Sequence, residues 1–311
     1  MKPTVIVCPV EFSAEGRSAL EMALALARCF QAELHVVRVE SRFRVEAGGA
    51  DAALRARVED FVASANVDGR TVATVVLSGN PVDAVVEYSG SISGELIVVG
   101  QNGRRGSPYW SAGQFAKEVA QRTGSPTITV PKDHAPRTGT DAPFKNILCA
   151  IDFSPPSTFA LSQAIFAAQQ NGGRLTLLYV SEHSRDEAIS RQTLPSSDVG
   201  TNVEELKRKL KSLVPGGVLN WPDIEAEILT GTAHDAILAT ASEREADLIV
   251  LGQPWQMPHR IVMRSTVGAV LRRARCPVLT VPSPRPAADA GSMSATAVTN
   301  ENDHMASLAC R

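Results

Sequence analysis

Apolar residues along the chain follow two alternating patterns. Short runs rich in Val, Ile and Leu, such as Thr4–Val10 and Leu96–Val99, have the length and composition of buried strands. Longer segments lie between them, and their apolar residues recur at helical spacing, as Leu20 and Leu24 do within Ala14–Phe30. Near-continuous apolar strands separated by helices predict an α/β fold with a parallel sheet covered on both faces.

The first half of the chain contains a full series of such elements. The pattern predicts strands at Thr4–Val10, Leu34–Val39, Thr71–Leu77, Leu96–Val99 and Thr127–Val130. It predicts helices at Ala14–Phe30, Asp51–Ala65, Pro81–Ser89 and Ala112–Arg122. Proline at the start of the third helix fits, because its missing N–H has no helical partner there. The second half repeats the order from Asn146 to Val281.

The two halves also match in sequence. VIVCPVEFS parallels NILCAIDFS and aligns Glu11 with Asp152, while the segments that end in ELIVVG and DLIVLG align Gly100 with Gly252. SPTITVP and CPVLTVP close the two halves. Three matched landmarks in the same order indicate an internal duplication.

The spacing of these landmarks predicts the domain boundaries. The offset is 141 residues at Glu11 and 152 at Gly100, so repeat two carries extra residues around Ser181–Pro222. We expect domains at 1–133 and 144–282, joined by a connector rich in Pro, Gly and Thr. Residues 283–311 lack periodicity and are expected to form a disordered tail. Arg185–Asn202 has few large apolar groups and is expected to be mobile.

Composition, net charge and cysteine spacing limit the classes to which this protein can belong. The 311 residues are 44% hydrophobic and 21% charged, with a formal net charge of −2, which gives no general attraction to nucleic acid or anionic membrane. No apolar run is long enough for a signal peptide or a membrane span, so a cytoplasmic location is expected. The five cysteines show no zinc spacing, and Cys8 and Cys149 lie in strand-like runs where buried thiols are expected.

Candidate binding chemistry lies where the strands end. In an open parallel sheet, ligands bind beyond the carboxyl ends of the strands. An acid follows the first strand of each repeat, Glu11 and Asp152, and can accept hydrogen bonds from ribose or a base. Glycines follow the fourth strand, at Gly100 and Gly252, and precede a helix whose N-terminus favours phosphate.

On these residues the chain resembles the universal stress protein family, in its tandem two-domain form. The resemblance implies two Rossmann-like domains, related to adenine nucleotide α-hydrolases, each with a five-stranded parallel sheet of order 3-2-1-4-5 and helices on both faces. It also implies an ATP site built from the acid and a loop of form G-x2-G-x9-G-[ST]. Family dimers pair through strand five, so Thr127–Val130 is expected to face Val278–Val281, and a homodimer is a further expectation.

Repeat one keeps the glycines of this motif. Gln114 stands where Ser or Thr is expected, and Glu11 replaces Asp. The site residues that the resemblance implies in repeat one are Glu11, Val39, Gly100, Gly103, Gly113, Gln114 and Phe115.

Repeat two keeps the polar groups and loses glycines. Trp255 replaces the second glycine and Ser265 the third, and the indole crowds the space that phosphate would need. The residues implied in repeat two are Asp152, Val180, Gly252, Ser265, Thr266 and Val267. If ATP binds, with any Mg²⁺ that accompanies it, we therefore predict one site per chain, in repeat one.

Other functions stay open at this point. The chain has no GxxxxGK[ST], GxGxxG, HExxH or GxSxG motif, so no catalytic or metal-binding residue is assigned. The leading hypothesis is a stress-response sensor or scaffold that binds adenine nucleotide. The alternatives are a scaffold of the same fold without nucleotide, and a slow adenine-nucleotide hydrolase.

Overall fold

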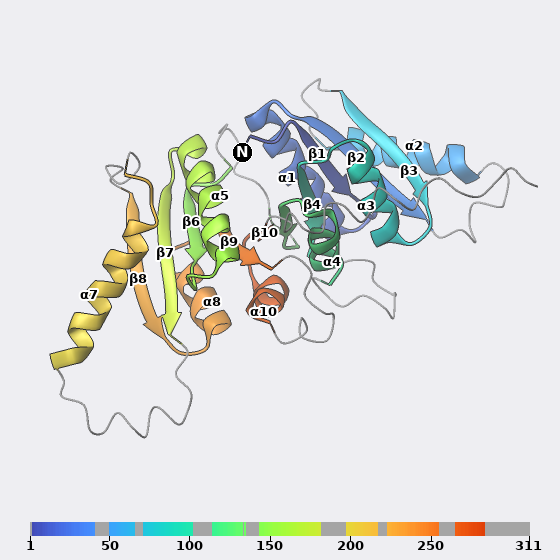
Figure 1. The fold of residues 1–311 in the computed structure, drawn as a ribbon. Helices are drawn as coiled ribbons and strands as arrows, with labels where there is room; N and C mark the ends of the chain where they lie inside the picture. The colour runs from blue at the N-terminus through green and yellow to red at the C-terminus, as the bar shows by residue number, and fades with distance from the viewer. Residues whose placement is uncertain are drawn as a thin grey trace, which may run out of the picture.

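The computed structural model describes residues 2–40, 50–65, 71–101, 114–132, 134, 143–181, 197–216, 223–254 and 265–283, without the side chains of residues 50, 51 and 197–202. Strands and helices alternate through both halves of the chain (Figure 1). The first half contains β1 (Val5–Pro9), α1 (Ala14–Phe30), β2 (Glu33–Glu40), α2 (Ala50–Ala63), β3 (Val72–Ser78), α3 (Pro81–Ser91), β4 (Leu96–Gly100), α4 (Gln114–Thr123) and β5 (Thr127–Val130). The second half contains β6 (Asn146–Ala150), α5 (Pro155–Asn171), β7 (Arg174–Ser181), α7 (Ser197–Ser212), β8 (Ile224–Thr230), α8 (Ala233–Glu243), β9 (Leu248–Gln253), α10 (Thr266–Arg273) and β10 (Val278–Pro282).

The described strands form one ten-stranded sheet of order β3-β2-β1-β4-β5-β10-β9-β6-β7-β8. Within each half the strands are parallel and follow the order 3-2-1-4-5. At the centre β5 and β10 pair antiparallel, with Thr127 opposite Thr280 and Thr129 opposite Val278. Because the halves run in opposite directions, the carboxyl ends of their strands lie at opposite edges of the sheet.

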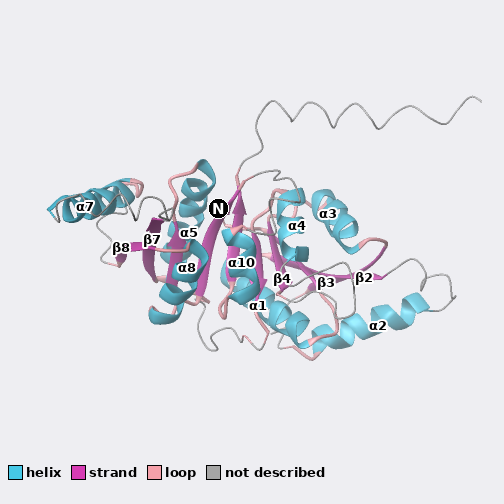
Figure 2. Cartoon of the chain, turned by 90° about the horizontal axis from the view of Figure 1, so that it is seen from below, coloured by secondary structure: helices cyan, strands magenta, loops and turns pink. Residues whose placement is uncertain are grey.

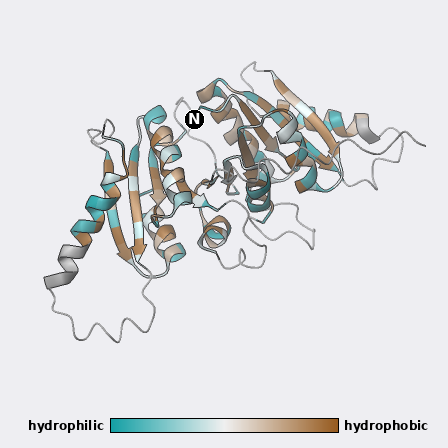
Figure 3. Cartoon of the chain, in the orientation of Figure 1, coloured by the Kyte–Doolittle hydropathy of each residue, from teal (hydrophilic) through white to brown (hydrophobic). Residues whose placement is uncertain are grey.

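Helices cover both faces of this sheet (Figure 2). On one face, an apolar core that includes residues of α1, α2, α5 and α7 runs across both repeats, and Phe30 stacks on Phe166 with ring centroids 6.0 Å apart. On the other face the apolar residues form two separate clusters, one under α3 and α4 and one under α8 and α10. The strands are largely apolar along their length, as a buried parallel sheet requires (Figure 3).

Local sequence signals fix the helix ends. Ser13 caps α1 by accepting the Gly16 N–H at 3.0 Å, and Asn80 caps α3 by accepting the Val82 N–H at 2.9 Å. At the other end of α1, Gln31 adopts a left-handed conformation with φ of 54°, while in α5 the same position is Gly172. Repeat two thus has the residue that this conformation prefers, and repeat one does not.

The structure adjusts the predicted boundaries by a residue or two. Helix α2 spans Ala50–Ala63 rather than Asp51–Ala65, and α4 spans Gln114–Thr123, so it ends one residue beyond the predicted Ala112–Arg122, whose first two residues lie outside the described part of the chain. In repeat two, α7 begins at Ser197, so the end of the segment expected to be mobile is helical. The rest of that segment and the tail, residues 284–311, lie outside the described residues.

Within the described part of the chain, no helix is both long enough and apolar enough to cross a bilayer.

Candidate functional site

The acid of repeat one lies where β1 and β2 end together. The Val10 N–H donates to the Val37 carbonyl at 2.8 Å, which places Glu11 beside the last residues of β2. The Ser13 hydroxyl donates to Oε1 of Glu11 at 3.1 Å, so the N-cap of α1 also holds the carboxylate. Val39 is buried at the same end of β2. This carboxyl edge therefore combines an acid with an apolar wall.

Repeat two builds the same arrangement with a shorter acid. The Ile151 N–H donates to the Leu178 carbonyl at 2.8 Å, which sets Asp152 near Val180 at the end of β7. Oδ1 of Asp152 accepts from the Ser154 hydroxyl at 2.5 Å and from the Ser154 N–H at 3.0 Å. Burial raises the pKa of Asp152, but hydrogen bonds from Ser154 and Ser157 outweigh it, and the pKa lies below its usual value. Asp152 is thus an ionised acceptor at neutral pH.

The glycines at the ends of β4 and β9 have a packing role in the described structure. A Cβ at Gly252 would lie 2.4 Å from the carbonyl carbon and oxygen of Pro156 and 2.5 Å from the Ser157 nitrogen. A Cβ at Gly100 would lie 3.0 Å from the carbonyl of Glu15. The first helix of each repeat therefore passes directly over the glycine. This contact explains both glycines without a ligand.

The described part of each fourth helix begins at the residue that aligns with the last position of the predicted motif. Gln114 is the first residue of α4, and Phe115 packs on the apolar cluster under α3 and α4. In repeat two, Ser265 caps α10 by accepting the Gly268 N–H at 3.2 Å. Thr266 begins α10 and Val267 packs on the cluster under α8 and α10. The residue after the first helical position is thus part of the core in each repeat.

Three positions of the predicted loops cannot be placed against this geometry. Gly103, Gly113 and Trp255 lie outside the described residues. The topology therefore places the acid, the β2 or β7 valine and the described start of the fourth helix at the same edge of the sheet, while the loop glycines of repeat one and the indole of repeat two remain predictions.

An aromatic cluster that the sequence analysis did not identify adjoins Glu11. The guanidinium groups of Arg38 and Arg57 lie 4.9 and 4.5 Å from the ring centroid of Phe12, and Arg38 also pairs with buried Glu40. Phe12 packs edge-on against Phe61 with centroids 5.6 Å apart. These contacts anchor α2 to the ends of β1 and β2. The signal in the sequence was the aromatic residue that follows the acid in both repeats.

Contacts between the repeats were also missed by the sequence analysis. Gln101, directly after β4, donates from Nε2 to the carbonyls of Leu271 at 2.8 Å and Ala274 at 3.2 Å. Lys117 of α4 donates to the Ser265 hydroxyl at 3.0 Å. Repeat one thus contacts both ends of α10, including the N-cap that belongs to the predicted site of repeat two.

The described residues do not form a protein-held metal site. No group of three acids, histidines or cysteines gathers among them. Mg²⁺ is usually held by one or two carboxylates together with substrate phosphates.

The fold and these edges define a class of protein: a tandem of two Rossmann-like α/β domains, each with an acid after its first strand and a helix N-terminus facing the same edge. The chain belongs to the universal stress protein family, whose profile matches residues 3–131 and again 143–282.

Individual relatives agree with this assignment. Universal stress protein A homolog 1 of Coxiella burnetii is 28% identical over 143 residues, which cover 44% of this chain and 96% of the relative. Universal stress protein MJ0531 of Methanocaldococcus jannaschii is 28% identical over 147 residues, covering 46% of this chain and 84% of the relative. A solved universal stress protein from Archaeoglobus fulgidus covers 91% of this chain and 100% of its own, with a TM-score of 0.63 and 21% identity.

Proposed function

We propose that this protein is a stress-response sensor or scaffold of the cytoplasm that binds one adenine nucleotide per chain, at the carboxyl edge of repeat one. The observation that carries the proposal is the placement of Glu11 beside the end of β2 and its hydrogen bond from Ser13. An oriented carboxylate next to buried Val39 suits a ribose or an adenine amino group. The start of α4 at Gln114 then suits the phosphates.

The choice of repeat rests on the loops that follow β4 and β9. Repeat one has Gly103 and Gly113 in its loop, and Gln114 retains an amide donor. Repeat two has the stronger acceptor in Asp152, but Trp255 occupies the position of the second glycine. One hydrogen bond contributes only about 1 kcal/mol net and does not offset steric exclusion.

A second candidate function is a scaffold without nucleotide. It is favoured by Gly100 and Gly252, because close helix packing explains each of them without a ligand. In that case the paired fifth strands would serve to hold a fixed pair of domains for a protein partner.

Native mass spectrometry of the purified protein, followed by calorimetric titration with ATP and Mg²⁺, tests the two functions. Gly113→Val should abolish ATP binding, while Asp152→Ala, which removes the acid of the other repeat, should leave it nearly unchanged. ATP binding that survives Gly113→Val and disappears with Asp152→Ala would place the nucleotide in repeat two. Absence of both co-purified nucleotide and binding heat in the wild type would favour the scaffold.

A further inference from the structure

A cavity of about 290 Å³ opens at the amino edge of repeat two, where β6 and β7 begin and α8 ends. Its polar lining comes from the strands, at Asn146, Arg174 and Thr176, and from the end of α8, at Glu243, Arg244 and Glu245. Asp152 follows the other end of β6, so the cavity is separate from the carboxyl edge that carries the nucleotide motif of repeat two. Its volume is close to the lower limit of about 300 Å³ for pockets that bind small molecules.

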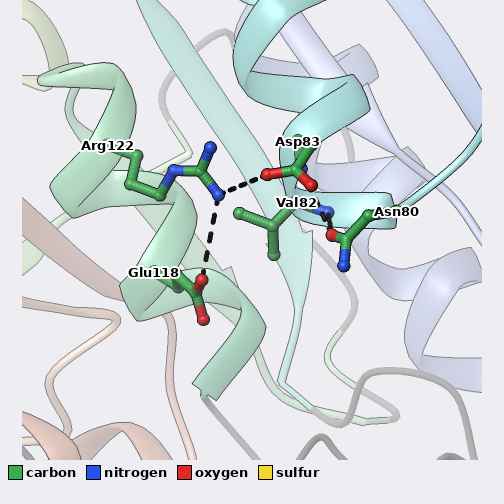
Figure 4. A network of polar contacts seen from close by, with 5 residues as sticks. All are labelled: Asn80, Val82, Asp83, Glu118 and Arg122. Carbon is green, nitrogen blue, oxygen red and sulfur yellow. Dashed lines mark hydrogen bonds and ion pairs between the residues drawn. The ribbon is translucent and has the colours of Figure 1, made fainter. Parts of the chain in front are cut away.

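The backbone around this cavity follows the same course as in repeat one. In repeat one, Arg122 of α4 pairs with Asp83 of α3 at 2.6 Å (Figure 4). The equivalent pair of repeat two, Arg273 of α10 and Asp235 of α8, is 2.7 Å long. The residue two positions after each of α3 and α8 has a left-handed backbone, with φ of 54° and 49°. Helices α3 and α8 are therefore placed alike, and the cavity does not result from a displaced helix.

In repeat one, two ring side chains fill the equivalent space. Nδ1 of His35, on β2, lies 2.7 Å from the Tyr88 hydroxyl of α3, and the centroids of the two rings are 5.9 Å apart. The offsets of 141 and 152 residues place Thr176 and Thr240 at the same positions in repeat two. Because two threonines replace two rings on an equivalent backbone, the space that the rings fill in repeat one is left open in repeat two.

One hydroxyl beside this space is buried without a partner. Thr240 is 1% exposed, and its Oγ1 has no hydrogen-bond partner among the described residues. Since Thr240 has the position on α8 that Tyr88 has on α3, its Cβ is directed in the same way, toward Thr176 on β7. A buried hydroxyl that makes no hydrogen bond is unusual in native proteins, because it keeps the cost of its desolvation. It therefore indicates that a polar group occupies the cavity.

The two walls of the cavity carry opposite charges. Arg174, the first residue of β7, forms no ion pair or side-chain hydrogen bond within the described part of the chain. The same holds, among the described residues, for the carboxylates of Glu243 and Glu245 at the end of α8. The C-terminus of α8 adds partial negative charge on the side of these two acids. Arg244 does not balance them, since it already pairs with two acids of β8 at 2.9 and 3.2 Å.

We propose that this cavity binds a free α-amino acid. The carboxylate of the ligand pairs with Arg174 on the strand side, and its ammonium group donates to the acids and free carbonyls at the end of α8. Thr176 supplies a hydroxyl for the rest of the ligand. The equivalent positions of repeat one are Glu33, Ser91 and Ser93, which do not provide a cation opposite two acids. The site is therefore confined to repeat two and is independent of the proposed nucleotide site.

The test is calorimetric titration of the full-length protein with each of the common α-amino acids, one at a time, at neutral pH. At least one should bind, and it should shift the NMR signal of the Ala246 amide, which borders the cavity. Thr176→His combined with Thr240→Tyr recreates the ring pair of repeat one and should abolish this binding. Arg174→Gln should weaken it about tenfold or more. The matched control is Arg208→Gln, at an exposed cation of α7, which should leave it unchanged.

Derivatives of the amino acid that binds distinguish a zwitterion site from a site for one charge. Its amide lacks the carboxylate and its N-acetyl form lacks the ammonium group, and each should bind about tenfold more weakly or worse.

Circular dichroism melts establish that the variants are folded. We expect the double variant to fold because repeat one holds the same ring pair on an equivalent backbone, and Arg174→Gln to fold because Arg174 is exposed. Gly113→Val should not change the affinity for the amino acid, so this result is separate from the test of the nucleotide site. Three outcomes would overturn the proposal: no binding of any amino acid, binding that persists in the double variant, or equally tight binding of the amide or the N-acetyl form.

Discussion

Gly252→Ala should destabilise the protein even though it adds one methyl group. The new Cβ would lie 2.4 Å from the carbonyl carbon and oxygen of Pro156 and 2.5 Å from the Ser157 nitrogen. These are backbone atoms at the start of α5, so no side-chain rotation relieves the contact. Helix α5 packs on β9, β10, β6 and β7 and cannot move without disturbing the core. Overpacking of this kind costs typically about 1–3 kcal/mol, and we expect the upper part of that range.

Substitutions at two other glycines provide comparisons for the loss of stability expected in Gly252→Ala. At Gly100 the added Cβ would lie 3.0 Å from the carbonyl of Glu15, so Gly100→Ala should cost less, about 1 kcal/mol. At Gly90, inside α3, nothing lies within 4 Å, and Gly90→Ala should stabilise by up to about 1 kcal/mol through helix propensity.

Urea denaturation followed by far-ultraviolet circular dichroism, without any ligand, measures all three variants. The expected order of stability is Gly90→Ala above wild type, then Gly100→Ala, then Gly252→Ala. If Gly252→Ala matched the wild type, close helix packing would not be the reason for glycine at the end of β9. A role in ligand approach would then be the better explanation.

Three further predictions concern charge and the join between repeats. Glu40→Gln should cost about 3 kcal/mol by leaving Arg38 buried without its charge partner, whereas replacing both residues by Met and Leu should cost less in the same urea assay. Asp152 has a lowered pKa, so its contribution to stability is present above its unfolded pKa and is lost as pH falls through the folded pKa; Asp152→Asn should flatten acid unfolding over that window. The separate halves 1–133 and 144–282 should aggregate or self-dimerise in light scattering, because each exposes an unpaired edge strand, and monomers that ignore each other would contradict this.

The sequence alone determined the architecture of each repeat. Apolar residues recur at helical spacing in segments such as Ala14–Phe30 because one helix face packs on the sheet. This burial against the sheet is common to all proteins of this class. Local signals placed the helix starts, and the structure moved the ends of α2 and α4 by only one or two residues. The acids Glu11 and Asp152 were found for the same reason, since a residue that follows a buried strand must lie at the sheet edge.

Only the tertiary structure determined which side chains of the two repeats contact each other. Lys117 and Ser265 are 148 residues apart, and Gln101 and Leu271 are 170 apart. In the sequence, Lys117 and Gln121 are polar residues of a short helix, which periodicity assigns to solvent. They are buried because β5 pairs antiparallel with β10 and carries α4 onto the second repeat. A helical pattern in the sequence predicts that one face of a helix is buried. Which residues bury that face depends on the tertiary contacts that other segments of the chain make with it.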